Sequence, residues 1–223
     1  MRCDIDRNQL DETLLSELDG LDRAACALIK KAVALARHVT IVTNAEDEWV
    51  QQSAACFLPK VHAMLTHVEV CSARSKHENA FPSIENWKRI EYLERADSLA
   101  SFSRGSFCAS SSESMSTLDL LPLKEPSSPV SASPVDELAR QLQFISIGDS
   151  EYERAAVFEV KKSRPNILVK SVKLLPAPTI ASLTQQLKTV HGSLDSIFDS
   201  RESLDLKLQP SREASVVKSN QFV

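Results

Sequence analysis

The sequence predicts an α/β fold in which a parallel sheet carries helices on both faces. Short runs of β-branched and apolar residues alternate with helical patterns of ten or more residues, and this rhythm occurs on both sides of a serine-rich stretch. Strands that alternate with helices in this way form βαβ units, whose strands lie parallel and are covered on both faces. The apolar content of 43% over 223 residues is sufficient for one core of ordinary size.

The first half opens with a helical pattern and continues with a strand. Apolar residues recur at steps of three and four from Leu10 to Leu35, and Gly20 is expected to divide this helix into two. The run HVTIVTNA reads as a strand that ends at Thr43. Asn44 is the expected N-cap of the following helix, since three acids come next, where the helix dipole favours anions.

The remaining elements repeat this order. The run HVEVCSA is a second strand, and the helix that starts near Ser83 is expected to turn Ile84, Trp87, Ile90 and Leu93 inward. Ser133 and Pro134 form an N-cap and first helical residue for VDELARQLQ. The strand FISI, a helix at 150–160, the strand NILVKSV and a helix at 180–197 follow. Leucines then alternate as in a short edge strand, at Leu204, Leu206 and Leu208.

Two stretches have compositions that are typical of disorder. Residues 98–133 are dense in serine and show neither a helical nor a strand period, so we expect a disordered insert that can be phosphorylated. Residues 209–223 are expected to form a disordered tail. The prediction is therefore a single domain at 8–208, interrupted by the insert at 98–133.

Charge and cysteine content exclude several classes of partner. The net charge of -4 provides no basic field for nucleic acid or for an anionic membrane surface. The five cysteines show no CxxC and no paired spacing, which favours thiols in a reducing compartment over disulfides or a zinc site. No apolar stretch approaches the roughly 18 residues of a membrane span, and no signal-peptide core is found. A cytoplasmic or nuclear location is the resulting expectation.

Acidic side chains follow the strand FISI at the point where it ends. Asp149, Glu151 and Glu153 come directly after Gly148, and ligands in such folds bind beyond the carboxyl ends of the strands. Mg²⁺ prefers oxygen ligands and takes one or two carboxylates together with water and phosphate. The spacing thus predicts a Mg²⁺ site at Asp149 and Glu153. The alternative interpretation is a turn and N-cap followed by solvated glutamates.

Four further side chains are candidates for binding an anion. Thr43 and Asn44 follow the other strand end, where a hydroxyl and the amides of a helix N-terminus can hold phosphate, or where a helix is simply capped. Lys88 can neutralise a phosphate as a point charge or be a solvated lysine. Arg74 either binds an anion or pairs with Glu78. No metal-ligand spacing is found for the histidines His38, His62, His67, His77 and His191.

The order of three motifs resembles a known family. TIVTNA, NWKRIEYL and FISIGDSEYE are similar to motifs two, three and four of the haloacid-dehalogenase-like (HAD-like) superfamily, closest to a eukaryotic group of unassigned function. VTNAEDEWVQQSAACFLPKV, VCSARSKHE and VKSVKLLPAPTIASLTQQLKTV extend the resemblance over nearly all of both blocks. It implies a Rossmann-like core and a Mg²⁺-dependent phosphohydrolase acting on a phosphorylated substrate. Thr43 would bind the phosphoryl group, Lys88 would neutralise it, and Asp149 with Glu153 would hold Mg²⁺.

The family's nucleophile motif is not found in this sequence. Active members attack phosphorus with an aspartate of a DxDx[TV] motif on the first strand, and a second aspartate serves as general acid and base. Asp4 and Asp6 come nearest to this pair, but only three residues precede them and Asn8 replaces the Thr or Val. DETLL at 11–15 belongs to the leucine-spaced helix.

Two explanations are consistent with a core that lacks its first strand. Either the sequence is truncated, or the protein is a family member that has lost catalysis; an open central sheet favours truncation. The resulting hypothesis is a HAD-like, Mg²⁺-dependent phosphohydrolase-type domain that is catalytically incomplete. The alternative is a non-catalytic interaction module whose phosphorylated serine-rich insert docks a protein partner. A generic nucleotide binder lacks support because no GxGxxG follows any strand.

Overall fold

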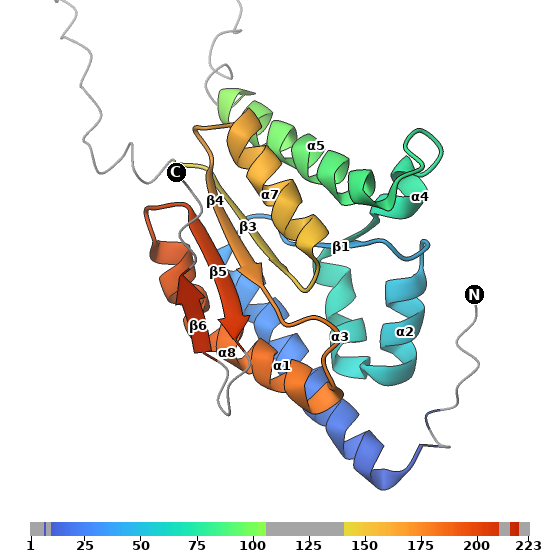
Figure 1. Ribbon diagram of the computed structural model, residues 1–223. Coiled ribbons are helices and arrows are strands. Elements are labelled where there is room, and N and C mark those ends of the chain that lie inside the picture. Colours follow the sequence, from blue (N-terminus) through green and yellow to red (C-terminus); the bar gives the residue numbers. More distant parts are fainter. Residues whose placement is uncertain (1–6, 8–9, 106–140, 210–214, 219–223) are drawn as a thin grey trace, which may run out of the picture.

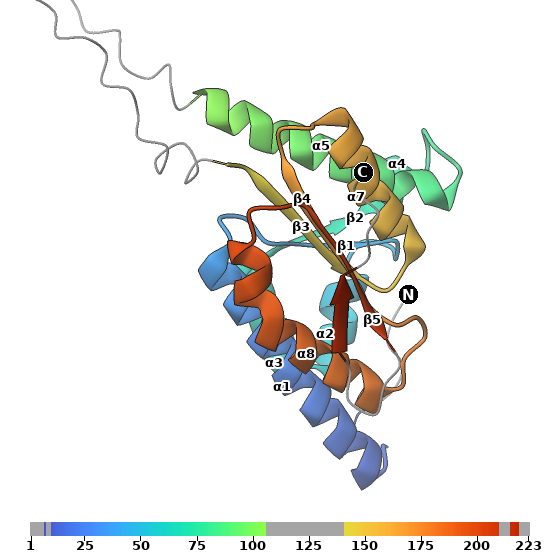
Figure 2. The ribbon, with the colours of Figure 1, turned by 60° about the vertical axis from the view of Figure 1, so that its left-hand side comes forward.

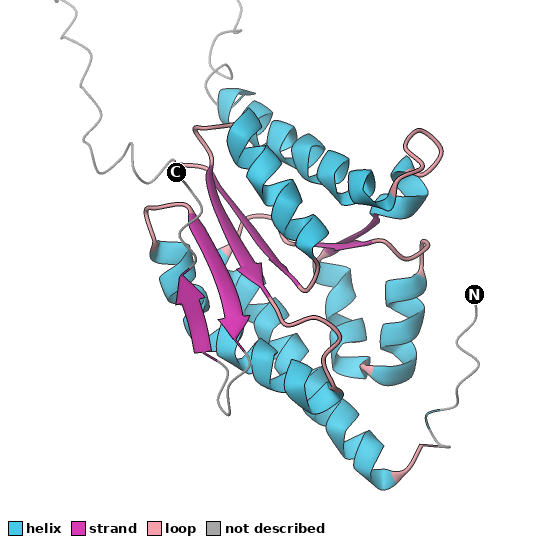
Figure 3. Cartoon of the chain, in the orientation of Figure 1, coloured by secondary structure: helices cyan, strands magenta, loops and turns pink. Residues whose placement is uncertain are grey.

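The computed structural model describes residues 7, 10–105, 141–209 and 215–218, and for 102–105 and 215–218 it describes the backbone alone. Most of these residues lie in helices and in two small sheets (Figure 3). The first half contains α1 (Glu12–Leu35), β1 (Thr40–Thr43), α2 (Trp49–Phe57), α3 (Pro59–Met64), η2 (Leu65–His67), β2 (Glu69–Ser72), α4 (Ala73–His77) and α5 (Ile84–Gly105). The second half contains β3 (Gln143–Gly148), α7 (Glu151–Ser163), β4 (Leu168–Lys173), α8 (Ile180–Asp199), β5 (Leu204–Gln209) and β6 (Ser215–Lys218).

The described strands form two sheets, where the sequence predicted one. β1 and β2 pair in parallel, with Thr40 opposite Glu69 and Thr43 opposite Ser72. In the second sheet β3, β4 and β5 are parallel, and β6 lies antiparallel to β5. The α/β class and the parallel pairing are confirmed. The prediction of β5 as an edge strand is wrong, because β4 and β6 flank it.

Helices cover both faces of the larger sheet (Figures 1 and 2). α5 and α7 lie side by side on one face, and α1 and α8 lie on the other. The face of α1 and α8 buries a core made mainly of Leu28, Val172, Val190, Leu194, Ile197, Leu204, Leu206 and Leu208. The face of α5 and α7 buries Tyr92, Ala96, Ala156, Val157, Val160, Ile167 and Val169. The core therefore has two layers, as expected when both faces of a sheet are covered.

Helix α5 connects the two sheets. Arg95 Nη1 donates to Thr40 Oγ1 of β1 at 2.8 Å, and the hydroxyl of Tyr92 lies 3.0 Å from Ser146 Oγ of β3. One turn closer to the start of α5, Lys88 reaches Glu153, which lies beyond the end of β3. Arg95 thus lies at the start of β1, and lower residue numbers on α5 lie nearer the ends of the strands. The carboxyl ends of both sheets consequently face the same edge, along the first half of α5.

Two predictions about the helices are wrong, one about a break and one about a start. α1 runs unbroken through Gly20, because a glycine inside a helix costs only about 1 kcal/mol and the packing of α1 against α3 and α8 offsets it. Asp11 caps this helix by accepting from the amide of Leu14 at 2.8 Å. Asn44 does not cap α2, which starts later; Glu48 takes the cap position with a left-handed φ of 66° and no side-chain cap.

The inward face of α5 is more polar than predicted. Trp87 is buried as expected, but Ile84 is 44% exposed. Lys88 and Glu91 are buried instead, because charged partners on neighbouring elements receive their side chains.

The described boundaries differ from the predicted insert and tail. α5 extends to Gly105, into the predicted insert, and β6 lies within the predicted tail. The rest of the insert, the predicted cap at Ser133 and Pro134, and the aspartates Asp4 and Asp6 lie outside the described residues. Among the described helices, none has both the length and the hydropathy that crossing a bilayer requires.

Candidate functional site

The turn after β3 carries the predicted acids and is built around the side chain of Glu153. Ser150 Oγ accepts from the amide of Tyr152 at 3.0 Å, and Glu153 Oε2 accepts from the amide of Ser150 at 2.7 Å. This reciprocal arrangement is a capping box, and it starts α7 at Glu151. Of the two interpretations of this segment, the capped helix start describes Ser150 and Glu153.

Gly148 is required by close approach rather than by its backbone conformation. No described glycine has a positive φ, so Gly148 is not needed for a left-handed backbone conformation. A Cβ at this position would instead lie 2.6 Å from Glu153 Oε2 and 2.7 Å from Glu153 Cδ. The side chain of Glu153 folds back over the last residue of β3, and only glycine leaves room for it.

Lys88 and Glu153 meet at this strand end. Lys88 Nζ forms an ion pair with Glu153 Oε1, and both side chains are about one-tenth exposed. Each oxygen of Glu153 is therefore engaged, one by the ammonium and the other by the Ser150 amide. A buried charge is stable only when it is paired and hydrogen-bonded, and this pair meets that condition.

Asp149 lies on the surface beside the pair. Asp149 is exposed, and its carboxylate forms no hydrogen bond or ion pair with any of the described residues. Its backbone oxygen accepts from Lys173 Nζ at 2.6 Å. The carboxylate of Asp149 is thus available to a cation, whereas Glu153 is already bound within the protein.

Lys173 is a second buried lysine at this edge that sequence reasoning missed. Its ammonium also donates to the Leu174 oxygen at 3.0 Å and lies 3.9 Å from Glu151 Oε1. A signal was present in the sequence, because the segment VKSVK carries two lysines within a predicted strand. In the structure every residue of this strand is buried. The other, Lys170, reaches the opposite end of β4, where it donates to Gln143 Oε1 at 2.6 Å and to the Phe198 oxygen at 2.9 Å. Burial lowers the pKa of Lys170 to about 8.

Thr43 and Asn44 lie at the end of β1, on the neighbouring sheet. Thr43 Oγ1 accepts from the amide of Ala45 at 3.0 Å, which leaves the hydroxyl hydrogen available as a donor. The side-chain oxygen of Asn44 is buried and has no hydrogen-bond partner among the described residues. No described hydrogen bond or ion pair joins Thr43 or Asn44 to Lys88, Asp149 or Glu153. They share an edge with the buried pair but do not contact it.

Arg74 follows the second of its two predicted roles. Arg74 Nε donates to Glu78 Oε2 at 2.8 Å, and Arg74 Nη1 lies 3.5 Å from Glu46 Oε1. Its guanidinium also lies 6.0 Å from the centre of the Trp87 ring. These neighbours account for Arg74 without an external anion.

The donor set fits a magnesium ion held by one carboxylate. Mg²⁺ keeps several waters and binds through one or two carboxylates and substrate phosphate. Asp149 can supply that carboxylate, but Glu153 can join it only if Lys88 withdraws.

Comparison of the chain with protein-family models, with curated proteins and with solved structures finds no match in any of the three.

Proposed function

We propose that this chain is a HAD-like, Mg²⁺-dependent phosphohydrolase-type domain that binds a phosphate group but lacks the nucleophile of the aspartyl-phosphate route. The observation that carries the proposal is the buried Lys88–Glu153 pair at the end of β3, with the carboxylate of Asp149 exposed next to it. A phosphate group is neutralised by a lysine ammonium, and its metal ion is held by a carboxylate; this strand end carries both.

Each residue has a defined part in this proposal. Lys88 offers an ammonium that neutralises phosphate oxygens, and Thr43 offers a hydroxyl donor from the end of β1. Asp149 holds Mg²⁺, which would supply charge neutralisation at the phosphate. Glu153 orients Lys88 and caps α7, so it acts as a positioning residue.

The division between the two sheets supports the same proposal. β1 and β3 each pair on one side only within the described residues, and α5 spans both sheets. In the HAD-like arrangement that the motifs resemble, the strand bearing the nucleophilic aspartate would belong to one sheet together with β1 and β3. We therefore expect binding of phosphate without turnover by this chain.

The test is calorimetric titration of Mg²⁺ into the full chain in the presence of inorganic phosphate. Asp149→Asn should weaken Mg²⁺ binding by roughly tenfold or more, whereas Glu151→Gln, a matched change two residues on, should leave it unchanged. Equal binding by wild type and Asp149→Asn would overturn the site. Phosphatase activity that persists in Asp149→Asn would also contradict it.

One observation favours the second function, a non-catalytic interaction module. Both oxygens of Glu153 are satisfied inside the protein, so the pair is stable without any ligand. In that case binding of a protein partner would depend on the serine-rich insert. Deletion of residues 106–133, which leaves α5 intact, should then abolish capture of a partner identified with the phosphorylated full chain, and unchanged capture would exclude this role.

A further inference from the structure

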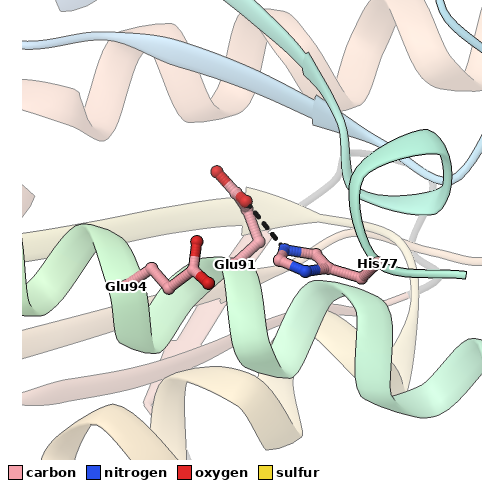
Figure 4. A group of neighbouring side chains, drawn as sticks. All are labelled: His77, Glu91 and Glu94. Atoms are coloured by element: carbon pink, nitrogen blue, oxygen red, sulfur yellow. Dashed lines mark hydrogen bonds and ion pairs between the residues drawn. The ribbon is translucent and has the colours of Figure 1, made fainter. Parts of the chain in front are cut away.

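A second cluster of charged side chains lies where α4 packs against α5, one turn of α5 away from Lys88. His77 comes from the end of α4, and Glu91 and Glu94 come from one face of α5 (Figure 4). His77 and Glu91 are buried, whereas the side chain of Glu94 is 50% exposed. No role was predicted for these residues, because a separation of 14 positions between His77 and Glu91 is not a metal-binding spacing.

The geometry of the cluster is that of a cation site. His77 Nε2 lies 3.0 Å from Glu91 Oε2. Lys76 Nζ donates to Glu91 Oε2 at 2.9 Å and to Glu94 Oε2 at 2.6 Å. One ligand atom from each of His77, Glu91 and Glu94 lies within 4.8 Å of the other two. The ammonium of Lys76 thus holds the position between the two carboxylates that a cation would take.

The charges around Glu91 keep its carboxylate ionised. Burial raises the pKa of Glu91, but hydrogen bonds from Lys76, His77 and Cys71, together with the charge of Arg95, outweigh it and lower the pKa to about 2. Glu91 is therefore ionised, and its oxygen accepts a hydrogen from His77 Nε2. Glu69 pairs with Arg95 as well. Three carboxylates (Glu69, Glu91, Glu94) then lie close to the side chains of Lys76 and Arg95.

We propose that His77 Nε2, Glu91 and Glu94 bind a divalent transition-metal ion of the zinc type, in exchange for the ammonium of Lys76. An imidazole ligand selects zinc, copper or nickel over Mg²⁺ and Ca²⁺, which prefer oxygen alone. On binding, the ring proton of His77 moves from Nε2 to Nδ1, and Lys76 turns into the solvent. Three protein ligands leave a fourth position for water.

The structure requires little movement to close this site. Metal–ligand distances of about 2.0–2.2 Å place tetrahedral ligand atoms roughly 3.4 Å apart, and His77 and Glu91 are already that close. The half-exposed Glu94 is the ligand that must approach. A hollow of about 340 Å³, lined by Lys76, Cys71, Ser75 and Arg95 among others, gives the lysine room to leave.

Cys71 borders the hollow. Burial, and then the hydrogen bond to Glu91, raise the pKa of its thiol. The group of ligand atoms that lie close together consists of His77, Glu91 and Glu94 and does not include Cys71. The proposed ligand set is therefore nitrogen and oxygen only, which distinguishes it from a cysteine zinc site.

The experiment is a titration of the metal-free full chain with Co²⁺, followed by visible absorption. Wild type should bind one Co²⁺ with a tetrahedral spectrum that lacks a sulfur-to-cobalt band and is abolished by Zn²⁺ but not by Mg²⁺. Glu94→Gln, an exposed change, should weaken binding by roughly tenfold or more, and His77→Asn should abolish it. Lys76→Met should tighten binding by about tenfold, since it removes the competing charge. Circular dichroism checks that each variant is folded.

Matched controls separate this site from others. His62→Asn changes an exposed histidine on α3 and should leave the spectrum unchanged, as should Asp149→Asn, so the outcome is independent of the proposed Mg²⁺ site. The proposal is overturned if Co²⁺ produces no spectrum with either wild type or Lys76→Met. It is also overturned if Lys76→Met binds no tighter than wild type, or if Glu94→Gln binds as wild type does.

Discussion

The two sheets of this protein are stabilised in different ways. All six residues of β4 are buried, and the larger sheet is packed between two apolar layers. The four residues of β1 are all only partly buried, and β2 has one buried residue. Polar contacts hold the smaller sheet instead. Arg95 joins Glu69 at the start of β2 through two hydrogen bonds of 2.7 and 2.8 Å.

The same contrast applies to the helices beside each sheet. α8 turns an apolar stripe to β4 and β5. α5 carries apolar residues toward α7 but turns Glu91 and Arg95 toward α4 and β2. Short strands bury too little apolar surface to fix their neighbours, since stabilisation scales with the area removed from water. Ion pairs then determine the position of the smaller sheet, and both candidate sites lie beside such pairs.

The largest effect is expected in the apolar layer. Leu194→Ala removes a side chain that is 2% exposed in the core of α1, α8, β4 and β5. It should lower the free energy of unfolding by about 3 kcal/mol, because a cavity is left behind. Val33→Ala, on the half-exposed side of α1, should change it by less than about 0.5 kcal/mol. Urea unfolding of both variants measures the difference, and equal losses would contradict the described core.

A smaller loss is expected in the polar layer. Glu91→Gln removes the carboxylate that Lys76, His77 and Arg95 share. It should lower the free energy of unfolding by about 2 kcal/mol, and no more because the half-exposed Lys76 regains some hydration. Urea unfolding with a chelator present measures this loss without any metal contribution. Glu94→Gln, its exposed neighbour, is the control and should cost far less.

The Glu91 contribution should also depend on pH. The pKa of Glu91 in the folded protein, at about 2, lies below its ordinary value of 4.5, so this stability is present above pH 5 and is lost as pH falls toward 2. The difference in free energy of unfolding between wild type and Glu91→Gln should therefore shrink as the pH falls across that range. A difference between the two proteins that stays constant from pH 5 to pH 3 would contradict the proposed ion-pair network.

The smallest effects compare two glycines. Gly148→Ala places a Cβ against Glu153 Oε2 and should displace this oxygen from the Ser150 amide, at a cost of about 1 kcal/mol for the lost cap. Gly20→Ala meets no atom within 4 Å and should stabilise α1 by about 0.5–1 kcal/mol. Thermal unfolding of both variants shows whether Gly148→Ala lowers the stability and Gly20→Ala raises it. Stabilisation by Gly148→Ala would show that Glu153 does not fold back over this residue.

Local patterns were sufficient to predict most elements of the described structure. The leucine spacing of α1 and α8, the β-branched runs of β1 and β4, and the N-cap at Ser150 all depend on residues that are close in sequence. Hydrophobic periodicity reports which face of an element is buried without reference to its partners. For the same reason the pairing of Lys88 with Glu153 could be predicted only as two residues at one edge of a sheet, and not as a contact.

Tertiary structure alone determined how polar groups were satisfied. Apolar periodicity predicted Ile84 on the inner face of α5, but charged partners on α4 and α7 placed Lys88 and Glu91 there. The composition and the order of the elements determined an α/β protein with parallel strands. The division into two sheets, the close approach that requires Gly148 and the meeting of His77 with Glu91 depend on distances between segments far apart in sequence. Burial gives such contacts their strength, because a polar group removed from water must find its partner within the protein.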